Sequence, residues 1–390
     1  MSVPMDAPSR SWLRASDVDV TDLAVLAETE TVAADYPFAH SVVKNVLIYD
    51  SHSLPLGDRR AEVEAELARA LAEGPGVILL KSAFSDTSVI DAATQAFLAI
   101  IESERASGGD QGDHFGVPGA NARIWNAQEK LARLAPDVFV EYFANDPIAL
   151  GAHAWLGPGY QMTSQVNLVY PGGKAQEPHR DYHLGFCTDE RAEEYPAHAH
   201  HMSGFLTLQG AVAHCDMPVE SGTTMLLPHS QRYPLGYVAW RNPEVKKYFA
   251  EHMVQLPLEK GDVVYFSPAL LHGAGTNHTS DVQRMANLLQ VSSAFGRAME
   301  SLNRLDMCEI TYPVLAEKAK QANWTTRDTQ NVVAACAEGY SFPTNLDSDQ
   351  PIGGLAPITQ AEVMLAALQR GASADEAIAD LRAQYRRTLP

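Results

Sequence analysis

The chain has 390 residues, of which 46% are hydrophobic and 20% charged, a balance typical of a globular protein with a substantial core. The formal net charge of −19 argues against nucleic acid and anionic membranes as partners, because both require a basic face on the protein. The 4 cysteines form no C-x-x-C pair, which argues against a disulfide framework or a cysteine zinc site and fits a reducing compartment.

The stretch 1–20 is largely polar and lacks the apolar core of a signal peptide. No apolar run approaches the ~20 residues that span a bilayer. We therefore expect a cytoplasmic protein that has no membrane partner.

The first part of the chain predicts an irregular arm over 1–57, followed by helices around one buried strand. The predicted elements are a short helix within 22–33, a helix over 58–73, a strand over 77–80, and helices over 89–101, 124–134 and 136–144. The glycine-rich stretch 108–121, which contains Phe115, is a loop that could form a pocket wall or a surface connection.

From residue 161 the apolar period changes to two, so Thr163, Gln165 and Asn167 share one face of a predicted strand. Further short strands are predicted over 204–213, 223–227, 252–258, 263–267 and 284–293. Many short strands separated by turns indicate a sandwich or barrel-like β domain.

Helical patterns return after residue 296. They predict helices over 312–322, 326–338, 359–369 and 374–385, with a linker or lid over 345–357. Met364, Ala367 and Leu368 form an apolar stripe that suits either a cap on the pocket or a dimer face, so a homodimer is a candidate assembly. We divide the chain into an N-terminal arm and helix (1–75), a β domain (76–296), and a C-terminal helical extension that packs on the core (297–390).

His179 and Asp181 stand two residues apart, just after the turn at 171–173. In an extended segment their side chains point to one face and Arg180 points to the other, so an imidazole and a carboxylate make half of a metal site. His272, after the apolar run 263–266, is the candidate third ligand. Two histidines and one carboxylate form the facial triad of non-haem Fe(II) oxygenases.

Arg284 begins the next predicted strand after His272. A guanidinium at this position suits bidentate pairing with the far carboxylate of a dicarboxylate co-substrate. The alternative is an ordinary surface or ion-pair arginine.

These residues, taken in order, resemble the phytanoyl-CoA dioxygenase family of Fe(II)- and 2-oxoglutarate-dependent oxygenases. The motifs that carry the resemblance are His179-x-Asp181, Glu220-Ser221-Gly222, Leu226-Leu227-Pro228-His229-Ser230, Lys260-Gly261-Asp262, His272-Gly273-Ala274-Gly275 and Arg284. The resemblance covers roughly 77–295 and implies a mainly β fold with flanking helices around a double-stranded β-helix (jelly-roll, cupin-like) core. Pro228-His229-Ser230 departs from the family's frequent Pro-Gly-Ser-His, so the resemblance does not define the substrate-side rim of the pocket, although it still defines the metal site.

The resemblance implies a dioxygenase, an oxidoreductase that oxidises a small-molecule metabolite with Fe(II), 2-oxoglutarate and O2 and releases succinate and CO2. Ascorbate is a candidate stimulant. The implied contacts are His179, Asp181 and His272 for iron, Arg284 for 2-oxoglutarate, and Thr163, Gln165 or Asn167 for additional hydrogen bonds. Because related halogenases lack the carboxylate, Asp181 favours hydroxylation, desaturation or ring chemistry. The candidate substrate residues are Tyr182, His183, Arg123, Trp125 and Phe115.

Other interpretations remain open from the sequence. The chain could be a jelly-roll protein that binds a metal or ligand without redox turnover, or a cupin-like metal hydrolase or isomerase. A second H-x-D motif, His214-Cys215-Asp216, is interpreted as structural or pocket-lining. The histidines at 198, 200 and 201 are interpreted as a solvated loop rather than a metal site.

Overall fold

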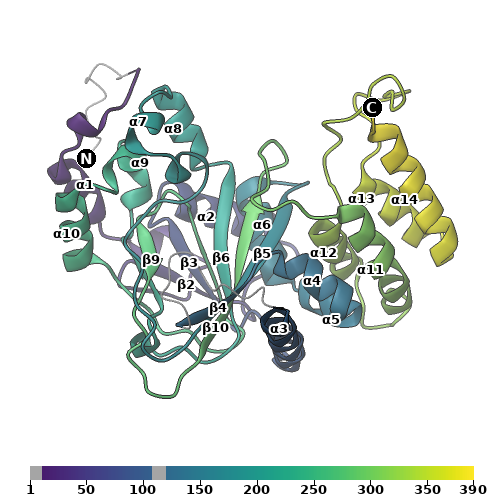
Figure 1. Cartoon of the computed structure of the whole chain (residues 1–390), viewed down its shortest axis with the longest axis horizontal. Coiled ribbons are helices and arrows are strands. Elements are labelled where there is room, and N and C mark those ends of the chain that lie inside the picture. Colours follow the sequence, from purple (N-terminus) through teal and green to yellow (C-terminus); the bar gives the residue numbers. More distant parts are fainter. Residues whose placement is uncertain (1–10, 108–119) are drawn as a thin grey trace.

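A computed structural model describes residues 11–107 and 120–390. Its centre is an eight-stranded sheet with the strand order β1-β2-β3-β8-β6-β10-β5-β4 (Figure 1). These strands are β1 (Ser41–Val43), β2 (Val46–Asp50), β3 (Val77–Lys81), β4 (Asn121–Ile124), β5 (Gln161–Val169), β6 (Thr207–Ala213), β8 (Val263–Phe266) and β10 (Arg284–Ser292). The sheet is mixed, because β2 and β3 run parallel whereas the other neighbours are antiparallel.

A second sheet of two strands, β7 (Thr224–Leu226) and β9 (His272–Ala274), pairs antiparallel. Apolar side chains from one face of the large sheet, including Val264 and Phe266, pack in one cluster with Leu226 of β7 and Leu270 beside β9. The two sheets therefore face each other across a shared layer of apolar side chains. This arrangement is a double-stranded β-helix, or jelly roll, with flanking helices.

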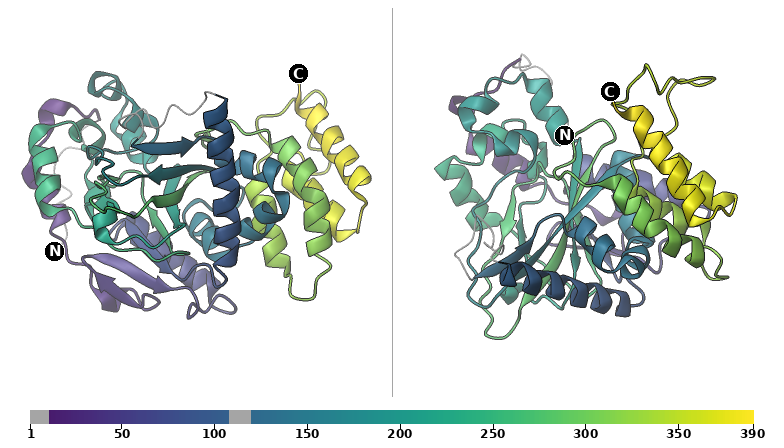
Figure 2. Two further views of the ribbon diagram at one scale, coloured as in Figure 1. Left: turned by 60° about the horizontal axis from the view of Figure 1, so that its bottom comes forward. Right: turned by 45° about the vertical axis from the view of Figure 1, so that its right-hand side comes forward.

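Helices cover the outer face of the large sheet and both ends of the molecule. They are α1 (Val20–Ala27), α2 (Arg60–Ala72), α3 (Ser88–Ala106), α4 (Ala127–Leu134), α5 (Pro136–Phe143), α6 (Asp146–Leu156), α7 (Asp189–Ala192), α8 (Ala197–Ser203), α9 (Gly236–Ala239), α10 (Pro243–His252), α11 (Arg304–Lys318), α12 (Thr326–Cys336), α13 (Gln360–Gln369) and α14 (Ala374–Thr388). Helices α11 to α14 lie together on one side of the sheet, and α1 and α10 lie on the other (Figures 1 and 2).

The alternation predicted along 161–170 is present in β5. Val166 and Leu168 enter the main core under the helices, whereas Asn167 pairs with Ala286 and shares the inner face with it. A residue-by-residue ladder with β10 fixes this register, and a slip by one residue would turn every side chain to the wrong face. The inner face of β5 therefore carries the polar residues Thr163, Gln165 and Asn167.

Some of the expected elements were wrong. The arm expected to be irregular contributes β1 and β2, joined by a tight turn in which Lys44 and Asn45 have φ values of 51° and 66°. The strand expected over 252–258 forms only isolated bridges at Val254 and Leu258. The helix expected to start at 124 begins at Ala127 and is preceded by β4.

Helices α13 and α14 contribute buried apolar side chains to the main core cluster. Met364 and Ala367 are fully buried in the same core cluster as Leu381 and the strand residue Val166. Leu368, the third residue of the predicted stripe, is half-buried and packs against the same cluster, so the stripe faces the core of its own chain. Among the described residues, no helix combines the length and the apolar character needed to cross a membrane.

Candidate metal centre

His179, Asp181 and His272 come together on the inner side of the jelly roll. His179 and His272 form a β-bridge in which each backbone N–H donates to the other residue's carbonyl, at 2.9 and 3.1 Å. The backbone N–H of Asp181 donates to the carbonyl of Pro268 at 3.1 Å. Backbone pairing between two distant segments therefore places the three side chains.

The donor atoms are close enough to share one ion. Nε2 of His179 lies 3.7 Å from Oδ1 of Asp181, and Nε2 of His272 lies 3.4 Å from Oδ2. All three ligand atoms lie within 4.8 Å of one another, and no other such group occurs in 11–107 and 120–390. Two donors at right angles around a metal, each about 2.1 Å from it, would lie about 3 Å apart. Slight closure around an ion would therefore complete the site.

Both imidazoles are held in the tautomer that a metal requires. Nδ1 of His179 lies 2.8 Å from the carbonyl of Glu177, and Nδ1 of His272 lies 2.8 Å from the carbonyl of Leu270. A carbonyl only accepts, so each Nδ1 carries the proton and each Nε2 presents its lone pair to the site. The donor set of two neutral imidazoles and one carboxylate fits a first-row metal such as Fe(II).

The electrostatics of the site agree with this donor set. Burial alone would raise the pKa of Asp181, but the neighbouring His179 and His272 outweigh it and hold this pKa well below its ordinary value. Burial, together with the nearby His179, lowers the pKa of His272. The side chains of His179 and Asp181 each keep 22% of their surface exposed, so an ion and a ligand can reach the donors.

Two further side chains support the segment from 179 to 181. Gln209 of β6 donates a hydrogen bond from Nε2 to Oδ2 of Asp181, which orients the carboxylate. Arg180 points the opposite way, as the alternation predicts, and donates to the carbonyls of Ser230 and Tyr233 at 2.6 and 3.0 Å.

Arg284 opens β10 on the inner face and is 8% exposed. Its guanidinium has no hydrogen bond or ion pair with any residue that the structure describes. Burial lowers the pKa of Arg284 to about 10, so the group remains charged at neutral pH. A buried charge without a counter-ion is costly, and a carboxylate is the group that would satisfy it.

The three polar residues of β5 lie at different distances from Arg284 along the ladder. Arg284 pairs with Val169, and Asn167 comes next on the same face; the buried Oδ1 of Asn167 accepts no hydrogen bond from the part of the chain that the structure describes. Thr163 pairs with Gln290, six residues beyond Arg284, or about 20 Å along the strand. Gln165, between them, accepts a hydrogen bond from Arg123. Asn167 is therefore the candidate best placed beside Arg284.

The candidate substrate residues border the triad to different degrees. Tyr182 is 3% exposed and has a φ of 62°, a strained value for a side chain of this size, directly after Asp181. His183 turns toward the backbone of Ser203, and burial lowers its pKa. Arg123 lies over the ring of Trp125, with its guanidinium carbon 4.8 Å from the ring centroid. Phe115 lies outside the described residues.

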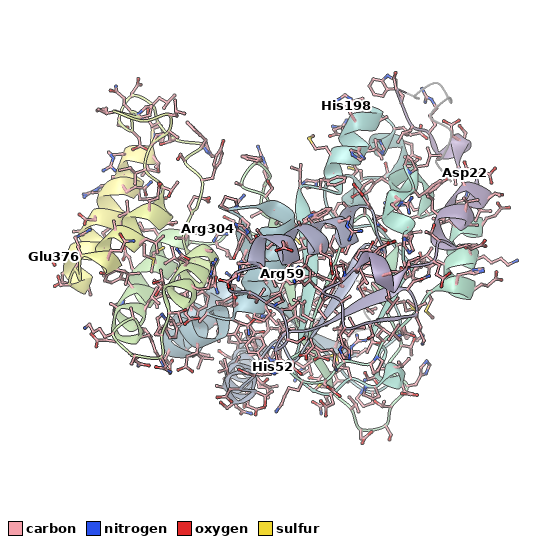
Figure 3. All side chains as sticks on the ribbon, turned by 180° about the vertical axis from the view of Figure 1, so that it is seen from behind. Asp22, His52, Arg59, His198, Arg304 and Glu376 are labelled. Atoms are coloured by element: carbon pink, nitrogen blue, oxygen red, sulfur yellow. The ribbon has the colours of Figure 1, made fainter. Side chains whose placement is uncertain are left out.

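The second H-x-D motif lies apart from the triad. His214 is 4% exposed, with Nδ1 2.8 Å from Oγ1 of Thr94 and Nε2 2.9 Å from the hydroxyl of Tyr142. Asp216 accepts instead from the backbone N–H of Lys260. The histidines at 198, 200 and 201 form no metal-binding group, but the solvated loop expected for them was wrong: they lie in helix α8, and His200 is 3% exposed with Nε2 2.9 Å from the carbonyl of Ala192. His198 lies at the edge of the molecule (Figure 3).

His229, where the chain departs from the family motif, lies against the N-terminal arm. It has a φ of 68°, in the left-handed region that glycine adopts most easily, and its Nε2 lies 3.0 Å from Oγ1 of Thr31. Burial lowers its pKa to about 4. At this position the chain therefore has a buried structural side chain where the family motif often has a glycine, which is a flexible turn residue.

Two residues near the site were missed by sequence reasoning. Gln209 had a signal, since it is the one long polar side chain in the mostly apolar strand 207–213. Glu300 had none, because it lies in an irregular connection between β10 and α11.

A family model described as Phytanoyl-CoA dioxygenase (PhyH) matches residues 72–286, more than half of the chain. No curated protein matches the chain. Three similar solved structures are a non-heme alpha ketoglutarate dependent epimerase, SnoN, from nogalamycin biosynthesis; AviO1 from Streptomyces viridochromogenes Tue57; and HygX from Streptomyces hygroscopicus with nickel and 2-oxoglutarate bound.

SnoN is 20% identical, with 60% of this chain and 82% of SnoN covered and a TM-score of 0.42. AviO1 is 18% identical, with 61% and 97% covered and a TM-score of 0.44. HygX is 14% identical, with 60% and 90% covered and a TM-score of 0.39.

Proposed function

Because the chain belongs to the phytanoyl-CoA dioxygenase family, we propose that it is an Fe(II)- and 2-oxoglutarate-dependent oxygenase that oxidises a small molecule. The observation that carries this proposal is the convergence of His179, Asp181 and His272, with both imidazoles in the metal-binding tautomer. The inner face of the large sheet in addition bears the buried Arg284, whose guanidinium has no partner among the described residues. Together they provide a metal site and an anchor for a dicarboxylate.

Each residue has a defined part in the proposed reaction. His179, Asp181 and His272 would hold Fe(II) on one side and leave its other side to ligands. When bound, iron with 2-oxoglutarate and O2 supplies the oxidising power that removes a substrate hydrogen, while 2-oxoglutarate is converted to succinate and CO2. Gln209 orients Asp181, and the carbonyls of Glu177 and Leu270 hold the imidazoles in place.

Arg284 would bind the far carboxylate of 2-oxoglutarate, with Asn167 beside it. The buried guanidinium offers two parallel N–H donors, which fix both the position and the direction of the co-substrate. The carboxylate ligand Asp181 occupies the position that halogenases leave to chloride. We therefore favour hydroxylation, desaturation or ring chemistry.

Anaerobic binding and succinate release test the proposal. We expect the full chain with Fe(II) and 2-oxoglutarate to develop the visible charge-transfer band of a chelated keto acid, and to release succinate in air. Asp181→Ala should abolish both, whereas Asp216→Ala, in the second H-x-D motif, should retain both. Full succinate release by Asp181→Ala would refute the ligand assignment. Metal binding without 2-oxoglutarate affinity would instead indicate a metal-binding protein, hydrolase or isomerase.

Arg284 gives a separate test of the co-substrate anchor. We expect Arg284→Leu to weaken 2-oxoglutarate binding by about 10- to 100-fold, because a charge-assisted hydrogen bond contributes about 1.5–3 kcal/mol. Affinity for the metal alone should change little. Titration of the charge-transfer band with 2-oxoglutarate measures the effect, and unchanged affinity in Arg284→Leu would rule out the anchor.

A further inference from the structure

One row of paired side chains crosses the inner face of the large sheet. Gln290 of β10 pairs with Thr163 of β5 on one side and with Gln209 of β6 on the other. Phe266 of β8 pairs with Gln209 and ends the row. The four strands are neighbours in the sheet (Figure 1). Side chains that are directly paired on one face have Cβ atoms about 4.5–5.5 Å apart, so each residue is within reach of the next.

Two contacts place one end of this row at the candidate metal centre. Gln209 donates from Nε2 to Oδ2 of Asp181. The ring of Phe266 lies 4.7 Å from the ring of His272, centroid to centroid. Gln290 is one strand beyond Gln209, about 5 Å away. The row therefore leads from the proposed metal ligands directly to Gln290.

The amide oxygens of Gln209 and Gln290 are both without a donor. The two residues are 5% and 6% exposed, and neither Oε1 accepts a hydrogen bond from any described residue. The two amides therefore do not pair with each other, although they are neighbours. Because Gln209 must direct its NH2 group at the carboxylate of Asp181, its oxygen points away from Asp181. Buried polar atoms without a partner are rare in folded proteins, so these two oxygens require an explanation.

The next row, two residues further along these strands, is also polar and uncharged. Ser292 of β10 pairs with Thr207 of β6, and the two residues are 1% and 0% exposed. Neither hydroxyl has a hydrogen-bond partner in the part of the chain that the structure describes. Thr207, Gln209, Gln290 and Ser292 thus form a wall of four neutral polar side chains, which we call the polar wall.

The position of Arg284 leaves the polar wall to the substrate rather than to 2-oxoglutarate. Arg284 and Gln290 lie six residues apart on β10, or about 20 Å along the strand. 2-Oxoglutarate held by the metal and Arg284 would extend from the metal toward Arg284. The polar wall begins at Gln209, beside the metal ligand Asp181, and continues away from Arg284 to Ser292.

We propose that the polar wall binds a substrate that carries at least two hydroxyl groups, such as a sugar or another neutral polyol. An amide oxygen only accepts hydrogen bonds, so the groups that satisfy Gln209 and Gln290 must be donors. A hydroxyl group can donate to either amide oxygen and can also accept from Thr207 or Ser292. This inference rests on the proposed function, because it takes the metal centre as the place of reaction.

A neutral polyol suits the polar wall better than a charged substrate does. An ammonium group would also donate to the amide oxygens, but it would lie close to a divalent metal ion, and the wall contains no carboxylate to offset its charge. A carboxylate group has no proton to donate to either oxygen. Hydroxyl groups supply the donors without a charge that must be removed from water.

Four probes built on one six-membered ring test the inference: myo-inositol, cyclohexanol, cyclohexylamine and cyclohexanecarboxylate. Their dissociation constants are measured by anaerobic calorimetry on the full chain loaded with Fe(II) and 2-oxoglutarate. We expect myo-inositol to bind most tightly, because it can satisfy both amide oxygens at once. Gln290→Met keeps the length of the side chain and removes the acceptor, so it should weaken the binding of myo-inositol about three- to tenfold.

Further variants provide the controls. Gln290→Glu keeps an acceptor oxygen and should lose less affinity than Gln290→Met. Gln369→Met makes the same exchange at an exposed position at the end of α13 and should bind as the wild type does. Ser292→Ala should weaken binding about threefold, and it carries the test if Gln290→Met fails to fold. The inference is wrong if the variant that carries the test binds myo-inositol with unchanged affinity, or if another probe binds the wild type most tightly.

The charge-transfer band of the chelated keto acid separates this inference from the proposed function. Gln290→Met should form the same band as wild type, because it leaves the metal ligands and Arg284 in place. If both proteins form the band while myo-inositol is not preferred, only the substrate assignment fails. If wild type forms no band, the proposed function fails, whatever the probes show.

Discussion

At the scale of single residues, the hydrogen bonds around His214 determine its protonation. Asn287 donates to the hydroxyl of Tyr142 and Thr94 donates to the carbonyl of Ile90, at 3.2 and 2.8 Å. Tyr142 is therefore free to donate to Nε2 of His214, while Nδ1–H donates to Thr94. This buried chain holds a neutral imidazole, and a second proton on His214 would break it.

We expect the free energy of unfolding to fall as the pH decreases below about 6.5. Burial lowers the pKa of His214 from its ordinary value of 6.5 to about 3, so the unfolded chain binds the proton more tightly than the folded one. The stabilisation is complete above 6.5 and is lost toward 3, by a few kcal/mol at most. Urea unfolding of wild type and His214→Gln at several pH values measures it. Parallel pH profiles for the two proteins would contradict the prediction.

At the scale of elements, the metal-binding segment depends on a buried guanidinium that points away from the metal. Arg180 is 2% exposed and lies over the ring of Tyr237, with its guanidinium carbon 5.2 Å from the centroid. A Cβ atom on Gly236 would lie only 1.7 Å from the guanidinium carbon, so a larger residue at 236 would displace the guanidinium from this position. Arg180 thereby joins the segment 179–181 to the segment 230–237.

We expect Arg180→Met to destabilise the fold by about 2–4 kcal/mol, because two buried carbonyls lose a charged donor. Metal affinity should also fall, since His179 and Asp181 flank the altered residue. Chemical unfolding and titration with Mn(II) provide the two measurements. Arg327→Met, on an exposed position of α12, serves as the control. Unchanged metal affinity in a destabilised Arg180→Met would limit Arg180 to a structural role.

Some strands and helices could be predicted from the sequence and others could not, for physical reasons. The strand 161–169 was predictable because its two faces meet different surroundings. The expected strand over 252–258 was wrong because Pro257 cannot donate to a ladder. The helix α6 was missed because it contains Gly151, whose lack of a side chain admits the Tyr265 ring that would otherwise lie 2.4 Å from its Cβ.

The sequence likewise predicted some residues of the candidate site and missed others. Spacing alone brought His179 and Asp181 to one face, and motif order supplied His272 and Arg284. Gln209 and Glu300 could not be placed in the same way, because their positions depend on the strand register of β6 and on an irregular connection. Local sequence patterns therefore identified the candidate metal ligands, whereas the residues around those ligands could be identified only from the three-dimensional structure.

At the scale of the whole molecule, one continuous apolar core joins the sheet to the C-terminal helices. It includes Leu47 of β2, Leu289 of β10 and Leu381 of α14. Arg304, at the junction of sheet and helices in Figure 3, donates to the carbonyl of Met162 at 3.1 Å. A shared core predicts that sheet and helices unfold together, so that a ligand bound inside the jelly roll stabilises both.

We therefore expect Mn(II) followed by 2-oxoglutarate to raise the melting temperature of the whole chain in two steps. Each ligand at about 100 times its dissociation constant adds about 2.7 kcal/mol, and the two together should raise the midpoint by roughly 4–8 °C. In Arg284→Leu the metal step should remain, the 2-oxoglutarate step should shrink from about 2.7 to about 0.4–1.4 kcal/mol at the same ligand concentration, and EDTA should reverse both. Differential scanning calorimetry tests this directly. Two transitions, with only one shifted by ligands, would show that the C-terminal helices unfold independently of the metal-binding sheet.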